Sequence, residues 1–388
     1  MFLNEGGNIT ITNLQTNKTY SAEEVDLTKI NLNNFRKEIK KFLKTLNELF
    51  KKEYKKTLWK DNDIETAFIY NGSSSFILHP DYEESQILKY KPKMGDIDIT
   101  IPEEYLKSLY LLLEKLKNKP INCFQYKGNW RNNPDSLGDQ LNTIFRMYFD
   151  DDFNPVDKNG TQFINLQIDF EGVNFVNGSP DEFAKFGHSS SFEDAKENIK
   201  AMHHKILISS IFTAISKLPD SIVVTKTSTP DNLKQVTWNK TKPAKLVRFS
   251  GNSGIYNCLD PMMDNGKQVI WNGLKVYKEI NSKEGKYEKD LNKIFEFAFG
   301  GKGNISDFHS FVGLCKCIKK YCDKETQNDI LEIYIEGILS GKAPPKHKDI
   351  NIDIELKMSA INYYCKTTNT KVKNLETRIQ NYIRKFSK

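Results

Sequence analysis

The sequence contains no apolar run of the roughly 18–20 residues that a membrane-spanning helix requires. Its first residues, MFLNEGGNITITN, also lack the charged segment followed by an apolar segment that a secretory signal has. We therefore expect no membrane partner and a cytoplasmic location. Internal repeats and low-complexity tracts are absent as well, and the length suggests two or three packed domains.

Cysteine is scarce, with six residues among 388. Three of them lie in VGLCKCIKKYC, which lacks paired C-x-x-C spacing and nearby histidines, so we expect buried, reduced thiols rather than a zinc site. His203 and His204 do not form an H-E-x-x-H motif, and we expect neutral histidines packed against a sheet. The glycine-rich segments FSGNSG and FGGKGN lack the spacing of phosphate-binding loops and are expected to be turns.

The charge balance is mildly basic, with 57 lysine and arginine residues against 50 aspartate and glutamate residues and a net charge of +7. This excess fits a partner that carries phosphate, such as a nucleotide or a nucleic acid. A solvated, lysine-rich surface would give the same composition. Charge alone leaves both interpretations open.

Hydrophobic spacing predicts a mixed α/β (α+β) protein. Residues 8–20 alternate and predict an opening hairpin, whereas residues 31–57 have apolar side chains at helical spacing with lysines on the opposite face. Two strands are predicted at about 141–149 and 162–170, joined by a polar loop. A helix with serine caps is predicted to begin near Ser190.

The stretch MGDIDITI places Asp96 and Asp98 one residue apart among isoleucines, and Pro102 then opens a predicted helix. On a strand, residues two apart point to the same face, so both carboxylates leave one side of the sheet together. Like charges on one face repel each other, and aspartate is a poor strand former. A divalent cation is the simplest partner that would offset this repulsion.

A third acid, Asp169, lies between Ile168 and Phe170 on the later predicted strand. If that strand pairs beside the one that bears Asp96 and Asp98, all three carboxylates converge at one edge of a small sheet. Such a cluster suits one or two Mg²⁺ or Mn²⁺ ions, which take oxygen ligands together with substrate phosphates. Two ions of this kind can activate an attacking oxygen and stabilise a leaving pyrophosphate. We therefore interpret the three aspartates as candidate catalytic and metal-binding residues.

These residues resemble the nucleotidyltransferase superfamily of DNA polymerase β type. Its motif is an apolar residue with Gly-Gly or Gly-Ser, then an h-D-h-D/E-h strand and a later h-D/E-h strand, where h is apolar. The matching residues here are Tyr70, Gly72, Ser73, Asp96, Asp98 and Ile168-Asp169-Phe170. The resemblance covers roughly residues 60–215. It implies a mixed α/β core in which Mg²⁺ joins Asp96 and Asp98 to a nucleoside triphosphate, while Asp169 helps to activate the acceptor hydroxyl.

The resemblance also implies residues that hold the triphosphate. Gly72 and Ser73 would place backbone and side-chain donors on the β- and γ-phosphates, although an ordinary strand-ending turn is the alternative. Enzymes of this class often supply a lysine from a later helix, and Lys205 is the candidate here, with a plain surface lysine as the alternative. The spacer between Ser73 and Asp96 is 22 residues, longer than is usual in the family, so HPDYEESQILKYKPK is expected to be an inserted loop.

Two further features have more than one interpretation. Arg146 lies on the strand predicted to pair with that of Asp169, where it could meet substrate phosphates, balance the acids or be a surface arginine. Aromatic residues make up 12% of the chain and could supply a base-stacking surface, but most of them fall at core spacing. The serines at 189–191 are expected to cap a helix.

We expect three parts: residues 1–58 with the hairpin and basic helix, residues 59–220 as a nucleotidyltransferase core, and residues 221–388 as a mixed, then mainly helical region. The predicted reaction is metal-dependent transfer of a nucleoside monophosphate from an NTP to an acceptor hydroxyl. The acceptor stays open among RNA or DNA ends, tRNA, a protein, a small molecule and a second nucleotide. Two alternatives are a two-metal nuclease that uses the same carboxylates and a non-catalytic nucleic-acid-binding protein with incidental aspartates.

Overall fold

The structure, a computed structural model, describes residues 9–13, 17–117, 119–131, 133–157, 160–188, 190–215, 247–250, 254–257, 290–339 and 350–386. Contacts divide the chain into two compact units, Met1–Ala195 and Lys196–Lys388, and each is described by itself. Among the described helices, none combines the length and the apolar character needed to cross a bilayer. Ser189 and most of residues 221–289, the beginning of the region expected to be mixed, lie outside the described residues. The domain boundaries expected near 58 and 220 stay predictions.

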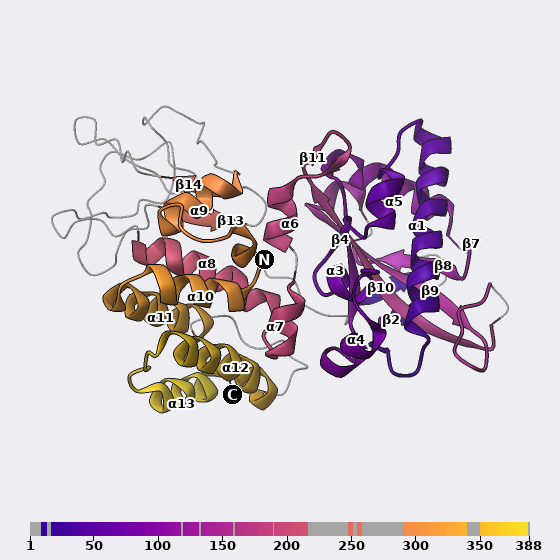
Figure 1. Ribbon diagram of the computed structural model, residues 1–388. Coiled ribbons are helices and arrows are strands. Elements are labelled where there is room, and N and C mark those ends of the chain that lie inside the picture. The colour runs from indigo at the N-terminus through magenta and orange to yellow at the C-terminus, as the bar shows by residue number, and fades with distance from the viewer. Residues whose placement is uncertain are drawn as a thin grey trace, which may run out of the picture. The chain divides into compact units, whose positions relative to one another are not determined.

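A mixed six-stranded sheet forms the centre of the first unit, in the order β4-β6-β10-β9-β8-β7 (Figure 1). Its strands are β4 (Tyr70–Asn71), β6 (Asp96–Pro102), β10 (Gln162–Val173), β9 (Gln140–Phe149), β8 (Phe124–Asn129) and β7 (Pro120–Ile121). β6 and β10 run parallel, whereas the other neighbouring strands are antiparallel. The predicted α/β fold is confirmed, and so are the two long strands that become β9 and β10.

Alternating side chains give this sheet one apolar face and one polar face. On β10, Ile168 and Phe170 are buried in the hydrophobic core, and Gln167 and Asp169 therefore point to the opposite side. Asp98 of β6 lies directly beside Asp169 in the parallel register. We call the side that carries Asp98, Gln167 and Asp169 the polar face.

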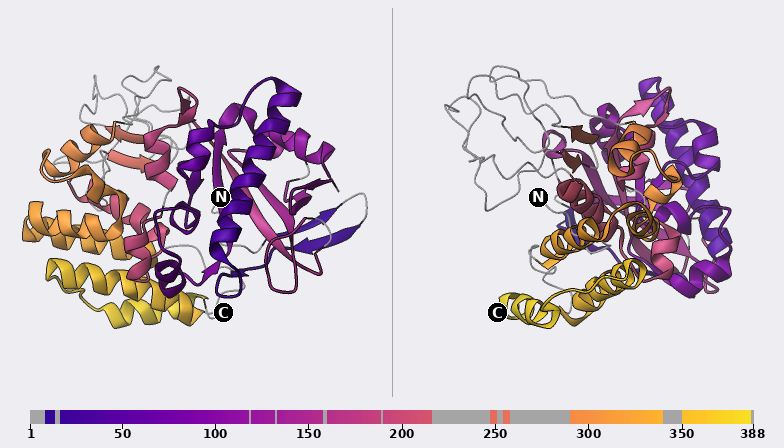
Figure 2. Two further views of the ribbon diagram at one scale, coloured as in Figure 1. Left: turned by 45° about the vertical axis from the view of Figure 1, so that its right-hand side comes forward. Right: turned by 60° about the vertical axis from the view of Figure 1, so that its left-hand side comes forward.

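The long helix α1 (Leu32–Tyr54) covers the apolar face, as the left view of Figure 2 shows. It begins after Asn31, whose side chain accepts a hydrogen bond from the backbone N–H of Asn34. The apolar positions expected from the sequence are buried, and the ring of Phe42 packs against that of Phe124. The predicted helix is confirmed, and its lysine-rich side faces solvent.

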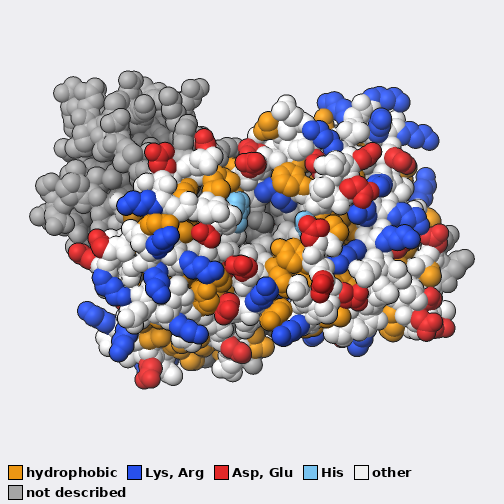
Figure 3. All heavy atoms as spheres, viewed as in Figure 1, with side chains coloured by type: hydrophobic (Ala, Val, Ile, Leu, Met, Phe, Trp, Pro, Cys, Tyr) orange, Lys and Arg blue, Asp and Glu red, His pale blue; other side chains and the backbone are white. Residues whose placement is uncertain are grey.

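Figure 3 shows basic side chains spread over the viewed surface of each unit with acidic ones among them.

A second helix, α5 (Leu106–Lys115), adds to the same hydrophobic core. The helix predicted to open at Pro102 starts with a 3₁₀ turn, Glu103–Tyr105, before α5 begins. Gly172 of β10 allows this close packing, because a Cβ at that position would lie 2.4 Å from Leu106. The two helices leave the polar face of the sheet free to carry its charged residues.

Short elements complete the first unit. The predicted hairpin is confirmed, since β1 (Thr10–Asn13) and β2 (Lys18–Ser21) pair antiparallel. Two further strand pairs are β3 (Val25–Asp26) with β5 (Lys93–Met94) and β11 (Phe175–Val176) with β12 (Ser179–Pro180). The short helices are α2 (Asp61–Glu65), α3 (Ser74–Ile77), α4 (Glu84–Tyr90), the 3₁₀ turn Pro134–Ser136, α6 (Glu182–His188) and α7 (Phe192–Lys196). The last of these, α7, ends at the unit boundary.

The described part of the second unit is mainly helical, as predicted. Its elements are α8 (Ala201–Ile215), the paired strands β13 (Val247–Ser250) and β14 (Gly254–Asn257), α9 (Leu291–Phe299), the 3₁₀ turn Ile305–His309, α10 (Phe311–Tyr321), α11 (Lys324–Leu339), α12 (Ile350–Thr368) and α13 (Leu375–Phe386). The expected turn at FGGKGN is confirmed, because Gly300 ends α9 with a left-handed backbone, φ 64°.

The continuous helix expected from Ser190 onward is wrong, because α7 and α8 are separate helices. Ser191 is the residue that caps α7, since its Oγ accepts a hydrogen bond from the Glu193 N–H. Asn198 then adopts a left-handed backbone with φ 55°. Asparagine tolerates this conformation better than most residues do, and a single such residue interrupts a right-handed helix.

Candidate metal centre

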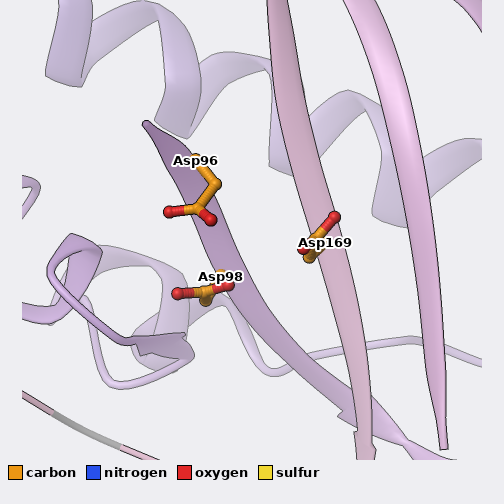
Figure 4. A group of neighbouring side chains, drawn as sticks. All are labelled: Asp96, Asp98 and Asp169. Carbon is orange, nitrogen blue, oxygen red and sulfur yellow. The ribbon is translucent and has the colours of Figure 1, made fainter. Parts of the chain in front are cut away.

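Three carboxylates meet on the polar face of the sheet. Asp96 and Asp98 come from β6, and the parallel register places Asp169 of β10 directly opposite Asp98. Each residue offers one carboxylate oxygen, and these three oxygens all lie within 4.8 Å of one another. Figure 4 shows two of the side chains on one strand and the third on the strand beside it. The predicted pairing and the predicted convergence of the three acids are therefore confirmed.

Asp169 is the most buried of the three, with 4% of its surface exposed. Burial raises the pKa of Asp169 to about 8, and the negative charge of Asp96 acts in the same direction. A hydrogen bond from Gln167 Nε2 to Asp169 Oδ2, 2.8 Å long, opposes this shift, and the Asn142 side chain acts in the same direction as Gln167. The second oxygen, Oδ1, is buried and accepts no hydrogen bond from the described residues. Such an oxygen is costly unless a positive charge or a donor reaches it.

The donor set of this cluster is suited to a hard divalent cation. Mg²⁺ and Mn²⁺ prefer carboxylate oxygens, and Mg²⁺ is commonly held by one or two carboxylates together with substrate phosphates. Asp96 and Asp98 are partly exposed, so a ligand from solvent can reach them, whereas Asp169 supplies the buried oxygen. Exposed acid clusters are common without a metal, and the buried, unsatisfied Oδ1 distinguishes this one. The residues present therefore fit such an ion.

The turn after β4 approaches the carboxylates closely. Asn71 pairs with Asp98 across the β4–β6 ladder, and Gly72 follows with a left-handed backbone, φ 52°. A Cβ on Gly72 would lie 2.0 Å from Asp98 Oδ2, so only glycine fits here without displacing that carboxylate. The structure thus brings Gly72 to the site, as the motif predicted. Ser73 comes next, at the start of α3, and its contact with phosphate stays a prediction.

The long spacer does not separate the two halves of the motif. The expectation that residues 79–93 form a loop is wrong, because this segment contains the helix α4. This helix is anchored by buried Ile87, and Glu84 Oε2 accepts a hydrogen bond from Asn33 Nδ2 near the start of α1. The chain therefore leaves the sheet after α3 and returns at β6, so that Gly72 and Asp98 remain neighbours.

Ser74 joins the turn to the strand that carries the acids. Its buried Oγ donates to the Asp96 carbonyl at 3.3 Å and accepts from the Asp98 N–H at 3.2 Å. Ser75 Oγ lies 2.8 Å from the Gly72 carbonyl. The sequence reasoning missed both serines, although the run of serines after the glycine was a signal of turn-stabilising hydroxyls.

A third residue that the sequence did not point to is Lys185 on α6. Its Nζ donates a hydrogen bond to the Tyr70 carbonyl, just before the Gly72 turn, and lies 5.2 Å from the centre of the Phe68 ring. Burial lowers the pKa of Lys185 to about 7, against the opposing influence of Glu171. Asn71 Nδ2 donates to Glu171 Oε2 at 2.6 Å. The acid Glu171 and the base Lys185 therefore both contact residues directly before Gly72.

Lys205 and Arg146 are the two remaining candidates from the sequence. Lys205 belongs to α8 of the second unit, and its contact with the triphosphate stays a prediction. Arg146 lies on the polar face but does not pair with the acid cluster, because it stands opposite Asn165 in the register. Its guanidinium lies 3.7 Å from the centre of the Phe163 ring. Arg146 is therefore not among the residues that the structure gathers around Asp169.

The two histidines are buried in the second unit. His203 Nδ1 lies 2.7 Å from the Tyr334 hydroxyl, and His204 Nε2 donates to the Phe308 carbonyl at 2.7 Å. Burial lowers the pKa of each to about 4, so both are neutral at pH 7, as expected. Their hydrogen-bond partners come from α11 and a 3₁₀ turn, and their packing against a sheet stays a prediction.

Comparisons of the chain with family models, with curated proteins and with solved structures found no match. The chemistry of the site is therefore what bears on function. Its main features are the three carboxylates, the glycine turn against Asp98 and the buried, unsatisfied oxygen of Asp169.

Proposed function

We propose that the chain is a metal-dependent nucleotidyltransferase, which moves a nucleoside monophosphate from an NTP to an acceptor hydroxyl and releases pyrophosphate. One observation carries this proposal: three carboxylates from adjacent parallel strands converge within 4.8 Å while the Gly72 backbone touches one of them. A carboxylate cluster beside a tight glycine turn can hold a cation and a polyphosphate together.

The donor nucleotide is expected on the β4 side of the cluster. Gly72 lacks a side chain, so a phosphate can approach the backbone of the turn, and Ser73 can add its N–H and hydroxyl. Lys185 lies behind this turn, where its hydrogen bond to the Tyr70 carbonyl holds the strand end in place. These residues would orient the triphosphate so that its α-phosphorus faces the carboxylates.

Asp96 and Asp98 would hold Mg²⁺ or Mn²⁺ with the triphosphate, and Asp169 would contribute its buried oxygen. When bound, the cation supplies positive charge for the phosphate oxygens and lowers the pKa of the attacking hydroxyl. The acceptor oxygen forms a bond to the α-phosphorus as the bond to the β-phosphate oxygen breaks. The hydroxyl proton would pass to the Asp169 carboxylate, which is ionised once the cation is bound, and then to solvent.

The test uses each of four NTPs labelled at the α-phosphate, with Mg²⁺ or Mn²⁺. Each is supplied alone, with total RNA and with single-stranded DNA, and the products are separated by size. We expect labelled product from the natural chain and none from Asp98→Ala. The matched control is Asp135→Ala, an exposed aspartate paired with Lys107, which should transfer label normally.

The outcomes separate this proposal from its alternatives. Undiminished transfer by a folded Asp98→Ala variant would contradict the site. Shortened nucleic acid in reactions without NTP would favour a nuclease. If no label is transferred and no NTP raises the melting temperature, a non-catalytic binding protein is the better interpretation.

A further inference from the structure

A cluster of cations and aromatic rings lies on the same polar face as the carboxylates. Lys127 comes from β8, Arg146 from β9 and Phe163 from β10, while Tyr20 comes from the β1–β2 hairpin. We call these four residues the cation–aromatic ledge. The hairpin is fixed beside the sheet by a hydrogen bond from the Glu23 N–H to the Asn165 carbonyl, 2.8 Å long.

Arg146 is held in one orientation by its neighbours. Its guanidinium lies 3.7 Å from the centre of the Phe163 ring and 5.7 Å from that of Tyr20. Its Nε donates to Asn165 Oδ1 at 3.2 Å, and its terminal nitrogens make no hydrogen bond within the described residues. A guanidinium fixed by stacking and by its Nε presents those nitrogens as a fork, the geometry that binds a phosphate through two hydrogen bonds.

Lys127 adds a second positive charge without a counterion. It is 6% exposed, and its Nζ hydrogen-bonds to Gln125 and lies 5.7 Å from the centre of the Tyr20 ring. Burial lowers the pKa of Lys127 to about 8, and the charge of Arg146 acts in the same direction. In the part of the chain that the structure describes, neither cation forms an ion pair with a carboxylate. Two neighbouring cations without an acid favour the binding of an anion.

The ledge and the glycine turn lie on opposite sides of Asp169 in the sheet. In the strand order, β9 and β8 are on the side of β10 away from β6 and β4, which carry the glycine turn. Arg146 stands opposite Asn165, four residues before Asp169, a separation of about 13 Å along the strand. Asn165 and Gln167, which lie between the ledge and Asp169, are buried and hydrogen-bonded to Glu23 and Ile9. A ligand that reaches both Asp169 and the ledge must therefore be long and must pass beside these residues.

We propose that the cation–aromatic ledge binds a single-stranded nucleic acid whose terminal hydroxyl lies at Asp169, which makes that strand the acceptor. Arg146 would contact a backbone phosphate, and Phe163, 47% exposed, would stack against a base. Stacked nucleotides are spaced by about 3.4 Å, so the separation corresponds to about four nucleotides, or fewer in an extended strand. A small molecule or a second mononucleotide does not reach both ends. The role as acceptor site rests on the proposed transferase function, whereas the binding itself does not.

Binding is tested with the full chain and a fluorescein-labelled 12-nucleotide RNA, or DNA of the same sequence, without NTP or divalent cation. Fluorescence anisotropy at several KCl concentrations gives the affinity and its salt dependence. We expect Arg146→Ala and Phe163→Ala each to weaken binding about tenfold. Arg146→Ala should also reduce the slope of log affinity against log salt by about one. The control, Lys115→Ala, removes one positive charge from α5, outside the polar face, and should change affinity less than twofold.

Equal affinities for Arg146→Ala, Phe163→Ala and Lys115→Ala would overturn the ledge as a binding site. Displacement of the RNA by polyglutamate at the same concentration would overturn it too, because an acidic chain cannot stack on Phe163. With label transfer established, the first two variants should raise the KM for the RNA and leave the KM for NTP unchanged. An unchanged KM for RNA would remove the acceptor role alone, whereas transfer by Asp98→Ala would contradict the proposed function and leave the binding data intact.

Discussion

The Gly72 backbone lies against the Asp98 carboxylate, so closely that a Cβ on Gly72 would stand 2.0 Å from Asp98 Oδ2. The two residues are brought together by the β4–β6 ladder, in which Asn71 is the partner of Asp98. Glycine is required at this position for two reasons. A side chain would clash with Asp98, and the φ of 52° is unfavourable for a residue with a side chain. The turn and the acid therefore form one structural feature, although the helices α3 and α4 intervene between them in the sequence.

Gly72→Ala should abolish transfer while the protein still folds. The added methyl group must push the Asp98 carboxylate out of the cluster, and the left-handed backbone costs about 1–2 kcal/mol in addition. The measurement is label transfer together with thermal unfolding. Gly300→Ala is the matched control, since Gly300 has a similar φ of 64° and a Cβ added there would meet no atom within 4 Å. If both variants lost activity equally, the contact with Asp98 would not be the cause.

The Asp169→Asn variant should keep its thermal stability and lose its transfer activity. Without divalent cations at constant pH, the variant should melt at the same temperature or about 2–4 °C higher, because a buried acid beside Asp96 is removed. Mg²⁺ with NTP should raise the melting temperature of the natural chain and not that of the variant. Transfer should fall by at least about a hundredfold, since even residues behind metal ligands cost ten- to a hundredfold. An unchanged response of the variant to Mg²⁺ and NTP would exclude Asp169 from the metal site.

The buried histidines predict that stability falls in mild acid. Burial lowers the pKa of His203 and of His204 from 6.5 to about 4, so the unfolded chain binds more protons between these values. Their contribution is complete above pH 6.5 and is lost as the pH falls towards 4, up to about 3 kcal/mol for each histidine.

Thermal unfolding at pH 7.5, 6 and 5 checks this dependence. His204→Gln should flatten the decline relative to the natural chain, because glutamine has no charge to gain. His79→Gln serves as the control, since His79 lies in the first unit and is only partly buried. Parallel declines for the natural chain and His204→Gln would show that other groups govern the acid sensitivity.

The carboxylate site could be predicted because the face of the strand on which each aspartate lies follows from its immediate sequence neighbours. Alternation of Asp96 and Asp98 with isoleucines specifies their common face, and the same alternation around Asp169 specifies its own. The apolar spacing of residues 32–50 likewise specified the helix that covers the sheet. Only the pairing of β6 with β10 had to be assumed, and the structure confirms it.

Lys185 could not be found in this way. It donates a hydrogen bond to the Tyr70 carbonyl, 115 residues earlier in the chain. A contact between such distant residues produces no periodic pattern in the sequence. Its neighbours Phe183 and Phe186 are buried, so the lysine resembles an ordinary member of an amphipathic helix. The break between α7 and α8 was missed for a similar reason, because Asn198 is compatible with a helix until its backbone angle is known.

The parallel pairing of β6 with β10 has a consequence for the insertions and deletions that this chain can tolerate. A slip of one residue between the two strands would turn either Asp169 or both β6 aspartates towards the core, and their apolar neighbours towards water. Residues 79–93 could change in length without moving a carboxylate, because both ends of that segment return to the same turn and strand. Lineages of this protein should therefore vary in the segment between Gly72 and Asp96 while the spacing within each acidic strand stays constant.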